Sequence, residues 1–219
     1  MRYSGFIKIT KSFVFILSIS AFLLTAAGAK ERAGSHKRVI TVSLLNDESA
    51  PAPEDIIFRL VSAASAEYEK MVDIELKVVE YIPYSGDLTL HPMDQAFLLS
   101  RLSTKGEIRI IFSNRAGRSE SDLIADKESG DHLAGASHPY FGHVIIYDVE
   151  GQAAKRDRAG NPALLTVIKH EIAHLFGVEH SEDADSFMST PSSRSFGRWT
   201  EEVIQRIVER RQKRWFPNC

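Results

Sequence analysis

The sequence is poor in cysteine, in excess charge of one sign and in long apolar runs. Cys219 is the only cysteine among 219 residues, which excludes an intramolecular disulfide framework and a zinc site made of several thiolates. The formal net charge is -2, too balanced for a dedicated nucleic-acid-binding protein. Hydrophobic residues make up 43% and charged residues 26%, which argues against disordered and coiled-coil classes. We therefore expect a globular domain with no nucleic-acid partner.

The start of the chain has the pattern of a secretory signal peptide. Basic side chains precede an apolar run over residues 13–27, and the small residues Ala27-Gly28-Ala29 resemble a signal-peptidase site. We predict a signal peptide over residues 1–29, export to the periplasm or the medium, and one domain over residues 30–219. After cleavage we expect no stable membrane association and a monomer. An uncleaved anchor is the alternative, although a run of about 15 residues is short for a membrane span.

Strand-like and helix-like segments alternate along the rest of the chain. Apolar and β-branched runs predict strands at residues 38–45, 74–81, 107–112, 133–137 and 143–147. Apolar residues at helical spacing predict helices at about residues 53–71, 93–102, 162–176 and 200–214. Asn161 is a candidate cap for the third of these helices, and the polar stretches 114–131 and 151–161 are predicted loops. The alternation favours a mainly parallel sheet in an α/β or α+β domain.

The most informative segment covers residues 170–180 and reads HEIAHLFGVEH. His170 and His174 are four residues apart on a predicted helix, so both rings project from one face. Gly177 can adopt a positive φ and end that helix abruptly, which allows His180 to return as a third ligand. Three neutral imidazoles with an open fourth position are typical of a single catalytic zinc ion. The alternative is a surface helix that carries three solvated histidines.

With this motif the chain resembles the metzincin clan of zinc endopeptidases, whose motif HExxHxxGxxH matches residues 170–180. Met188 follows the third histidine where the clan has its methionine turn. The resemblance implies a twisted, mainly parallel sheet with an antiparallel edge strand, an active-site helix and a C-terminal helix. It also implies zinc held by His170, His174 and His180, with Glu171 as general base in the hydrolysis of a protein or peptide substrate.

The resemblance also indicates where a substrate lies. Residues 133–137 would be the edge strand that pairs with it, and the segment 189–196 would line the pocket behind the zinc. Ser181 is similar to the residue of matrixins at that place. Archaemetzincins have cysteines where this chain has Ser181 and Ser186, so their second zinc site is expected to be absent. Thr190 replaces the tyrosine ligand of astacin-like enzymes.

Other polar groups have weaker interpretations. His132, His138 and His143 are expected to be ordinary surface or hydrogen-bonded histidines, with a second metal site as the alternative. The acidic residues 182–185 are expected to form a solvated loop, with calcium binding as the alternative. Two rival functions also stay open. The chain could be a non-catalytic zinc-containing binding module, or a zinc amide hydrolase that acts on a cell-wall polymer.

Overall fold

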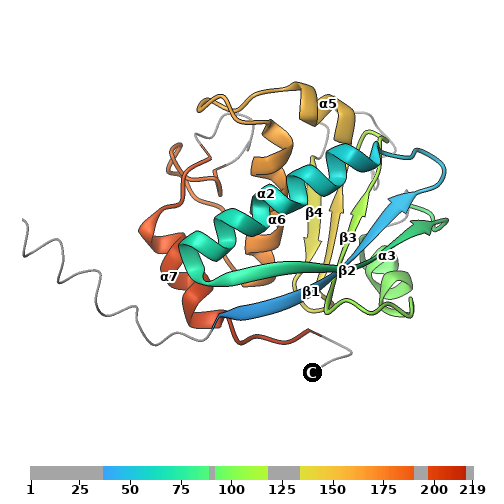
Figure 1. Ribbon diagram of the computed structural model, residues 1–219, viewed down its shortest axis with the longest axis horizontal. Coiled ribbons are helices and arrows are strands. Elements are labelled where there is room, and N and C mark those ends of the chain that lie inside the picture. The colour runs from blue at the N-terminus through green and yellow to red at the C-terminus, as the bar shows by residue number, and fades with distance from the viewer. Residues whose placement is uncertain (1–36, 89–91, 118–133, 190–196, 216–219) are drawn as a thin grey trace, which may run out of the picture. The chain divides into compact units, whose positions relative to one another are not determined.

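Five strands form one sheet in the order β2-β1-β3-β5-β4 (Figure 1). Strands β2, β1, β3 and β5 are parallel to one another, and the edge strand β4 is antiparallel to β5. The strands are β1 Arg38–Asp47, β2 Ile74–Tyr84, β3 Ile108–Phe112, β4 Gly135–His138 and β5 His143–Ile146. The predicted mainly parallel sheet with an antiparallel edge strand is therefore confirmed.

The structure is a computed structural model that describes residues 37–88, 92–117, 134–189 and 197–215. The predicted signal peptide, His132 and most of the predicted pocket segment 189–196 lie outside these ranges. Among the described residues, no helix combines the length and apolar character that crossing a bilayer requires.

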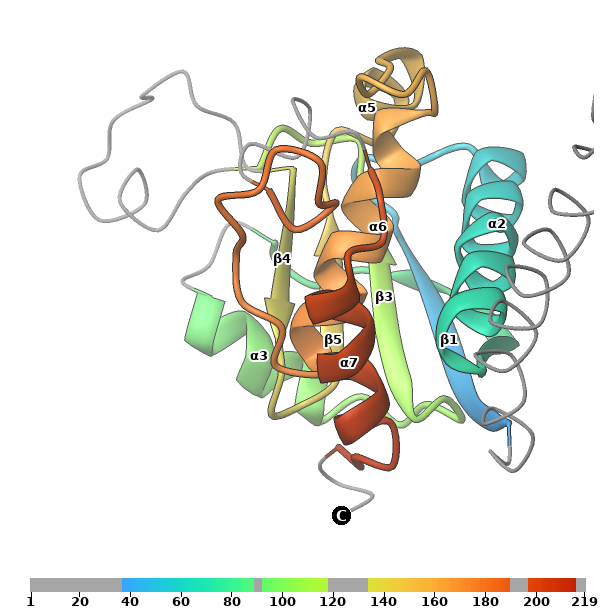
Figure 2. The ribbon, with the colours of Figure 1, turned by 90° about the vertical axis from the view of Figure 1, so that its left-hand side faces the viewer.

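Helices cover both faces of the sheet. Helices α2 and α6 contact each other on one face, as Figure 2 shows, and α7 packs against α2. Buried residues of these helices and of the facing strands form the main core. A smaller core on the other face joins Leu99 of α3 to Leu45, Ile111 and Ile145. The helices are α2 Glu54–Val72, α3 Pro92–Ser100, α5 Val149–Ala154, α6 Ala163–Leu175 and α7 Glu201–Arg210.

Strand residues alternate between the two cores, which explains why the interior strands are mainly apolar. Ile110 and Phe112 of β3 face α2 and α6, whereas Ile111 between them faces the smaller core. A parallel strand covered on both faces is apolar at most positions. The run of residues 108–112 is buried along its whole length and is apolar except at Arg109.

Several predicted boundaries were wrong. The predicted loop 151–161 begins inside a short helix, α5, that buries Val149 and Gln152. The last helix ends at Arg210, before the predicted residue 214. β2 continues through Pro83 to Tyr84, which a strand at the sheet edge allows because one side of it needs no ladder hydrogen bond.

The start of α6 also differs from the prediction, since Asn161 does not cap it. Pro162 occupies the N-cap position, and no side chain makes a capping hydrogen bond there. The preceding turn is instead held by the buried Asp157 carboxylate, which accepts the backbone N–H groups of Ala159 and Asn161 and the hydroxyl of Thr166. The prediction assigned to Asn161 a local role that Asp157 fulfils.

Candidate metal centre

The helix α6 that carries the motif is buried on nearly every side. Apolar residues around it pack into the main core, and even His170 and Glu171 are only 5% and 7% exposed. The helix ends in a Schellman arrangement at Gly177, which has φ 72°. The Gly177 and Val178 N–H groups donate to the carbonyls of His174 and Ala173 at 2.8 and 3.3 Å. The glycine therefore provides the abrupt turn that the sequence predicts.

This turn brings the three predicted ligands together. Donor atoms of His170, His174 and His180 all lie within 4.8 Å of one another. The Nε2 atom of His174 is 3.0 Å from that of His170 and 3.2 Å from that of His180. Two nitrogens bound tetrahedrally at zinc, each about 2.0–2.1 Å from the ion, lie about 3.4 Å apart. The spacing of these nitrogens therefore suits one small cation.

Backbone carbonyls orient two of the rings. His170 Nδ1 lies 3.0 Å from the Phe187 carbonyl, and His174 Nδ1 lies 2.6 Å from the Val178 carbonyl. A carbonyl can only accept, so both Nδ1 atoms carry the proton and both Nε2 lone pairs point into the cluster. Two lone pairs 3.0 Å apart repel each other unless a cation lies between them, so the donor set fits a metal ion.

Burial keeps these histidines uncharged. It lowers the pKa of His170 to about 4, and the nearby His174 acts in the same direction. Burial also lowers the pKa of His174, against the opposing hydrogen bond to Val178. Neutral imidazole is the form that binds metal, so burial favours the metal-binding form of His170 and His174.

The segment after His180 folds back under the cluster. Ser181 N–H donates to the Met188 carbonyl at 3.0 Å, and Ser189 N–H donates to the Ser186 carbonyl at 3.1 Å. Met188 itself is fully buried in the main core. Its neighbour Phe187 provides the carbonyl that orients His170, so this turn positions a candidate ligand directly, in agreement with the predicted methionine turn.

The side chain of Glu171, a residue of α6, lies against the edge strand β4. Burial raises the pKa of its carboxyl to about 8, and a hydrogen bond from the Ser137 side chain acts in the opposite direction. Gly135 lies directly against it: a Cβ on this glycine would be 2.6 Å from Glu171 Cγ. The absence of a side chain at residue 135 therefore makes room for the Glu171 carboxylate.

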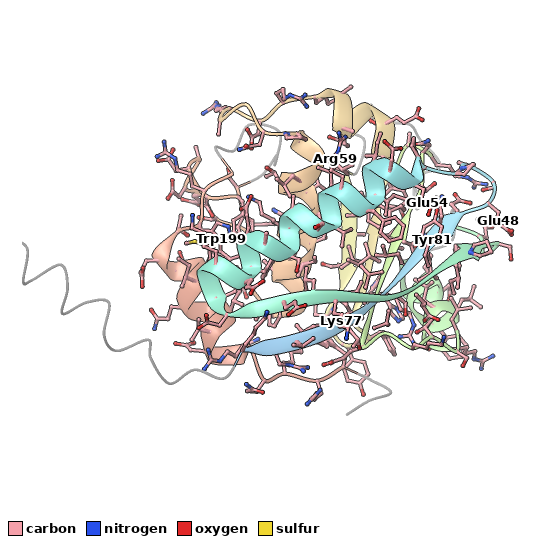
Figure 3. All side chains as sticks on the ribbon, viewed as in Figure 1. Glu48, Glu54, Arg59, Lys77, Tyr81 and Trp199 are labelled. Atoms are coloured by element: carbon pink, nitrogen blue, oxygen red, sulfur yellow. The ribbon has the colours of Figure 1, made fainter. Side chains whose placement is uncertain are left out.

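An ion pair between the buried Lys169 and the partly exposed Glu67 was missed by the sequence analysis. Lys169 is 2% exposed, and its Nζ lies 2.9 Å from Glu67 Oε2 and 2.9 Å from the Gly197 carbonyl. Trp199, which lies beside the C-terminal part of α2 in Figure 3, donates its Nε1–H to the same Glu67 oxygen at 2.9 Å. The pair ties α2 and α6 to the chain at Gly197. The one available signal was a lysine in an otherwise apolar part of α6.

The remaining candidate residues do not assemble a second metal site within the described chain. The three motif histidines are the one His/Cys/Asp/Glu group there with metal-binding spacing. His143 is fully buried, with Nε2 3.1 Å from Arg109 Nη1. Burial lowers the pKa of His143 to about 3, and the Arg109 charge adds to this effect. A cation that close disfavours a metal ion, so the hydrogen-bonded interpretation of His143 holds.

The acidic loop is held by protein groups. Asp185 forms an ion pair with Arg198 at 3.1 Å, and the Asp183 carboxylate accepts the Asp185 N–H at 2.9 Å. Glu182 and Asp183 are exposed. These contacts agree with a solvated acidic loop.

Comparisons with known proteins agree with this geometry. Residues 93–201 match the model of the peptidase M10 family, the matrixins. The fold is similar to archaemetzincin from Methanopyrus kandleri, with a TM-score of 0.61 and 12% identity over 82% of this chain and 98% of that one. It is also similar to metalloproteinase-II from Bacteroides fragilis, with a TM-score of 0.53 and 14% identity over 80% of this chain and 54% of that one.

A third structure with this fold is a zinc-dependent peptidase from Methanocorpusculum labreanum. Its TM-score is 0.50 at 13% identity, over 76% of this chain and 99% of that one. No curated protein sequence matches the chain. At these identities the likeness to the solved structures is one of fold.

Proposed function

Since the chain is a metzincin-like zinc metallopeptidase, we propose that it is an endopeptidase with one catalytic zinc ion held by His170, His174 and His180. The observation that carries this proposal is the convergence of three imidazoles, two of them fixed by carbonyls with Nε2 free to bind. A bound zinc ion would act as a Lewis acid and lower the pKa of a water molecule toward neutrality.

Glu171 is the proposed general base. Its carboxylate follows the first ligand and lies against Gly135 and Ser137 of β4. There it accepts the proton of the attacking water and later returns it to the leaving amine. Burial by itself favours the protonated form of this carboxyl, and a neighbouring dication restores the ionised form that a base needs. A site that only stores zinc has no use for a buried carboxylate there.

The edge strand β4 is the proposed substrate-binding strand. Among the described residues it lies at one edge of the sheet and pairs only with β5. An extended peptide can add to such an edge by main-chain hydrogen bonds. Because Ser137 contacts Glu171, a peptide held on this strand places a carbonyl near the proposed base. The proposed substrates are protein chains. We further propose that the protein is a monomer and that residues 1–29 direct its export.

The test is hydrolysis of an unstructured protein with and without a chelator, read by mass spectrometry. Cleavage that the chelator abolishes and added zinc restores supports the proposal. Glu171→Gln keeps the shape and removes the base, so the rate should fall by about 10² to 10⁴ with zinc content and fold unchanged. A native protein that binds zinc but cleaves no peptide would be a binding module. Hydrolysis confined to cell-wall fragments would make it an amide hydrolase of that polymer.

A further inference from the structure

An open groove of about 500 Å³ leads away from the metal centre toward α7. Ser137 and Pro139 line it at the C-terminal end of β4, and the candidate ligands His174 and His180 line its inner end. Arg206 and Arg210 of α7 line the far side. In Figure 2, α7 lies beside the C-terminal ends of α6 and β4, where these elements meet.

The two arginines have few contacts of their own. They are four residues apart on α7, so they share one face of that helix. Arg206 Nε reaches the Gly177 carbonyl at 3.4 Å, and Arg210 Nη1 reaches the Phe176 carbonyl at 3.5 Å, both long for hydrogen bonds. Among the described residues, no ion pair within 4 Å involves either of them. Most of their donors are therefore available to a ligand.

The acidic side chains nearby do not cancel this charge. Glu179 lines the groove and also an adjoining cavity, which Glu202 and Glu209 line together with Arg206. All three are exposed and lie more than 4 Å from either guanidinium. Within the groove itself two cations face one carboxylate. A zinc ion at the inner end would make the potential more positive still.

We propose that Arg206 and Arg210 bind a carboxylate side chain of the peptide substrate on the N-terminal side of the cleaved bond. This rests on the proposed peptidase function and names its substrate class. Antiparallel pairing is the more stable arrangement for a peptide added to β4. β4 runs from Gly135, beside Glu171, toward Pro139 in the groove. A peptide antiparallel to β4 therefore has the residues that precede the cleaved bond beside the arginines.

A purely structural role of Arg206 and Arg210 would give a different result. The carbonyls of Phe176 and Gly177 lie at the C-terminal end of α6, where cations stabilise a helix. If that were the whole role of the two arginines, their removal would lower stability and leave substrate preference unchanged. Measuring preference and stability on the same variants separates the two roles.

Binding is measured without hydrolysis on the zinc-loaded Glu171→Gln protein by fluorescence anisotropy. The probes are two labelled peptides that differ by Glu or Gln at one position before the bond, scanned over successive positions. We expect the Glu peptide to bind about two- to fivefold more tightly at one position or more, as for partly exposed charge pairs. This advantage should shrink as salt rises from 0.05 to 0.5 M, because exposed pairs are screened.

The deciding variant is Arg206→Gln/Arg210→Gln in the same background, which should bring the Glu-to-Gln ratio close to one. Arg206→Lys/Arg210→Lys should restore part of the ratio because it restores the charge. The matched control is Arg59→Gln/Lys77→Gln, which removes the same charge from exposed positions on α2 and β2, outside the groove (Figure 3). It should leave the ratio as in the parent.

The inference is overturned if no position before the bond favours Glu, or if the double Gln variant keeps the preference while folded and zinc-loaded. If that variant does not fold, the single Arg206→Gln change gives the same comparison. The failure of the peptidase proposal looks different, because the chain with Glu171 intact would then cleave neither peptide even when it prefers the acidic one. Cleavage of both peptides at equal rates would support the peptidase proposal and contradict the binding of a substrate carboxylate by the two arginines.

Discussion

Substitution of Gly135 by alanine tests the proposed role of Glu171 from outside the motif. An added Cβ would lie 2.6 Å from Glu171 Cγ, 2.8 Å from Oε1 and 2.9 Å from Cδ. Carbon atoms in contact prefer about 3.5–4.0 Å, so the carboxylate or β4 must move by about 1 Å. A displacement of that size at a reacting group costs on the order of 10²-fold in rate. Overpacking of this kind also lowers the free energy of unfolding by about 1–3 kcal/mol.

The assay is kcat/KM on a cleaved peptide, with zinc content and thermal unfolding measured on the same preparations. Gly135→Ala should lose about 10² in kcat/KM and keep its zinc, because the three atoms nearest to the added Cβ all belong to Glu171. In the Glu171→Gln background the same change should lower kcat/KM little further, since the general base has already been removed. Full activity in the folded Gly135→Ala variant, or equal losses in both backgrounds, would refute the reasoning.

Other perturbations give separate predictions. His174→Ala should abolish both zinc binding and hydrolysis, and full metal occupancy in that variant, measured by mass spectrometry, would contradict the ligand assignment. Burial and the Arg109 charge keep His143 neutral in the native state, with a pKa of about 3 against 6.5 when unfolded. Unfolding therefore takes up a proton below pH 6.5. The free energy of unfolding should decrease as the pH is lowered from 6.5 to about 3. His143→Gln should flatten that slope in urea titrations, and an unchanged slope would contradict this account. Lys169→Met removes the buried partner of Glu67 and should cost about 2 kcal/mol, read as a lower urea midpoint, whereas an unchanged midpoint would show that the pair adds nothing.

The local features of the candidate site were predictable from the sequence. Spacing of four residues places His170 and His174 on one face of any helix, and a glycine three residues later permits the turn that returns His180. The sheet type was predictable for a similar reason. Apolar runs alternating with helical periods favour parallel strands, and the five strands were placed close to their observed bounds.

Predictions from local sequence patterns were wrong where contacts between segments distant in the sequence determine the structure. Val208 continues the apolar spacing of the last helix, yet it is 39% exposed while Val203 and Ile207 are buried. The apolar spacing of α7 does not show where its contact with α2 ends. The predicted loop 151–161 includes most of α5, because six residues offer too little periodicity to recognise a helix. In the structure Val149 of this helix packs into the main core.

The three histidines, their spacing, the helix that carries them and the glycine that ends it can be predicted from the sequence, because they depend on residues within one or two helical turns. Three other features depend on the packing of distant segments: Gly135 makes room for Glu171, Phe187 orients His170, and Arg206 and Arg210 line the groove. These pairs are separated along the chain and meet only when β4, α6, α7 and the loop after His180 pack together. A sequence pattern reports local geometry, whereas the position of a base, the orientation of a ligand and the charge of a groove are properties of that packing.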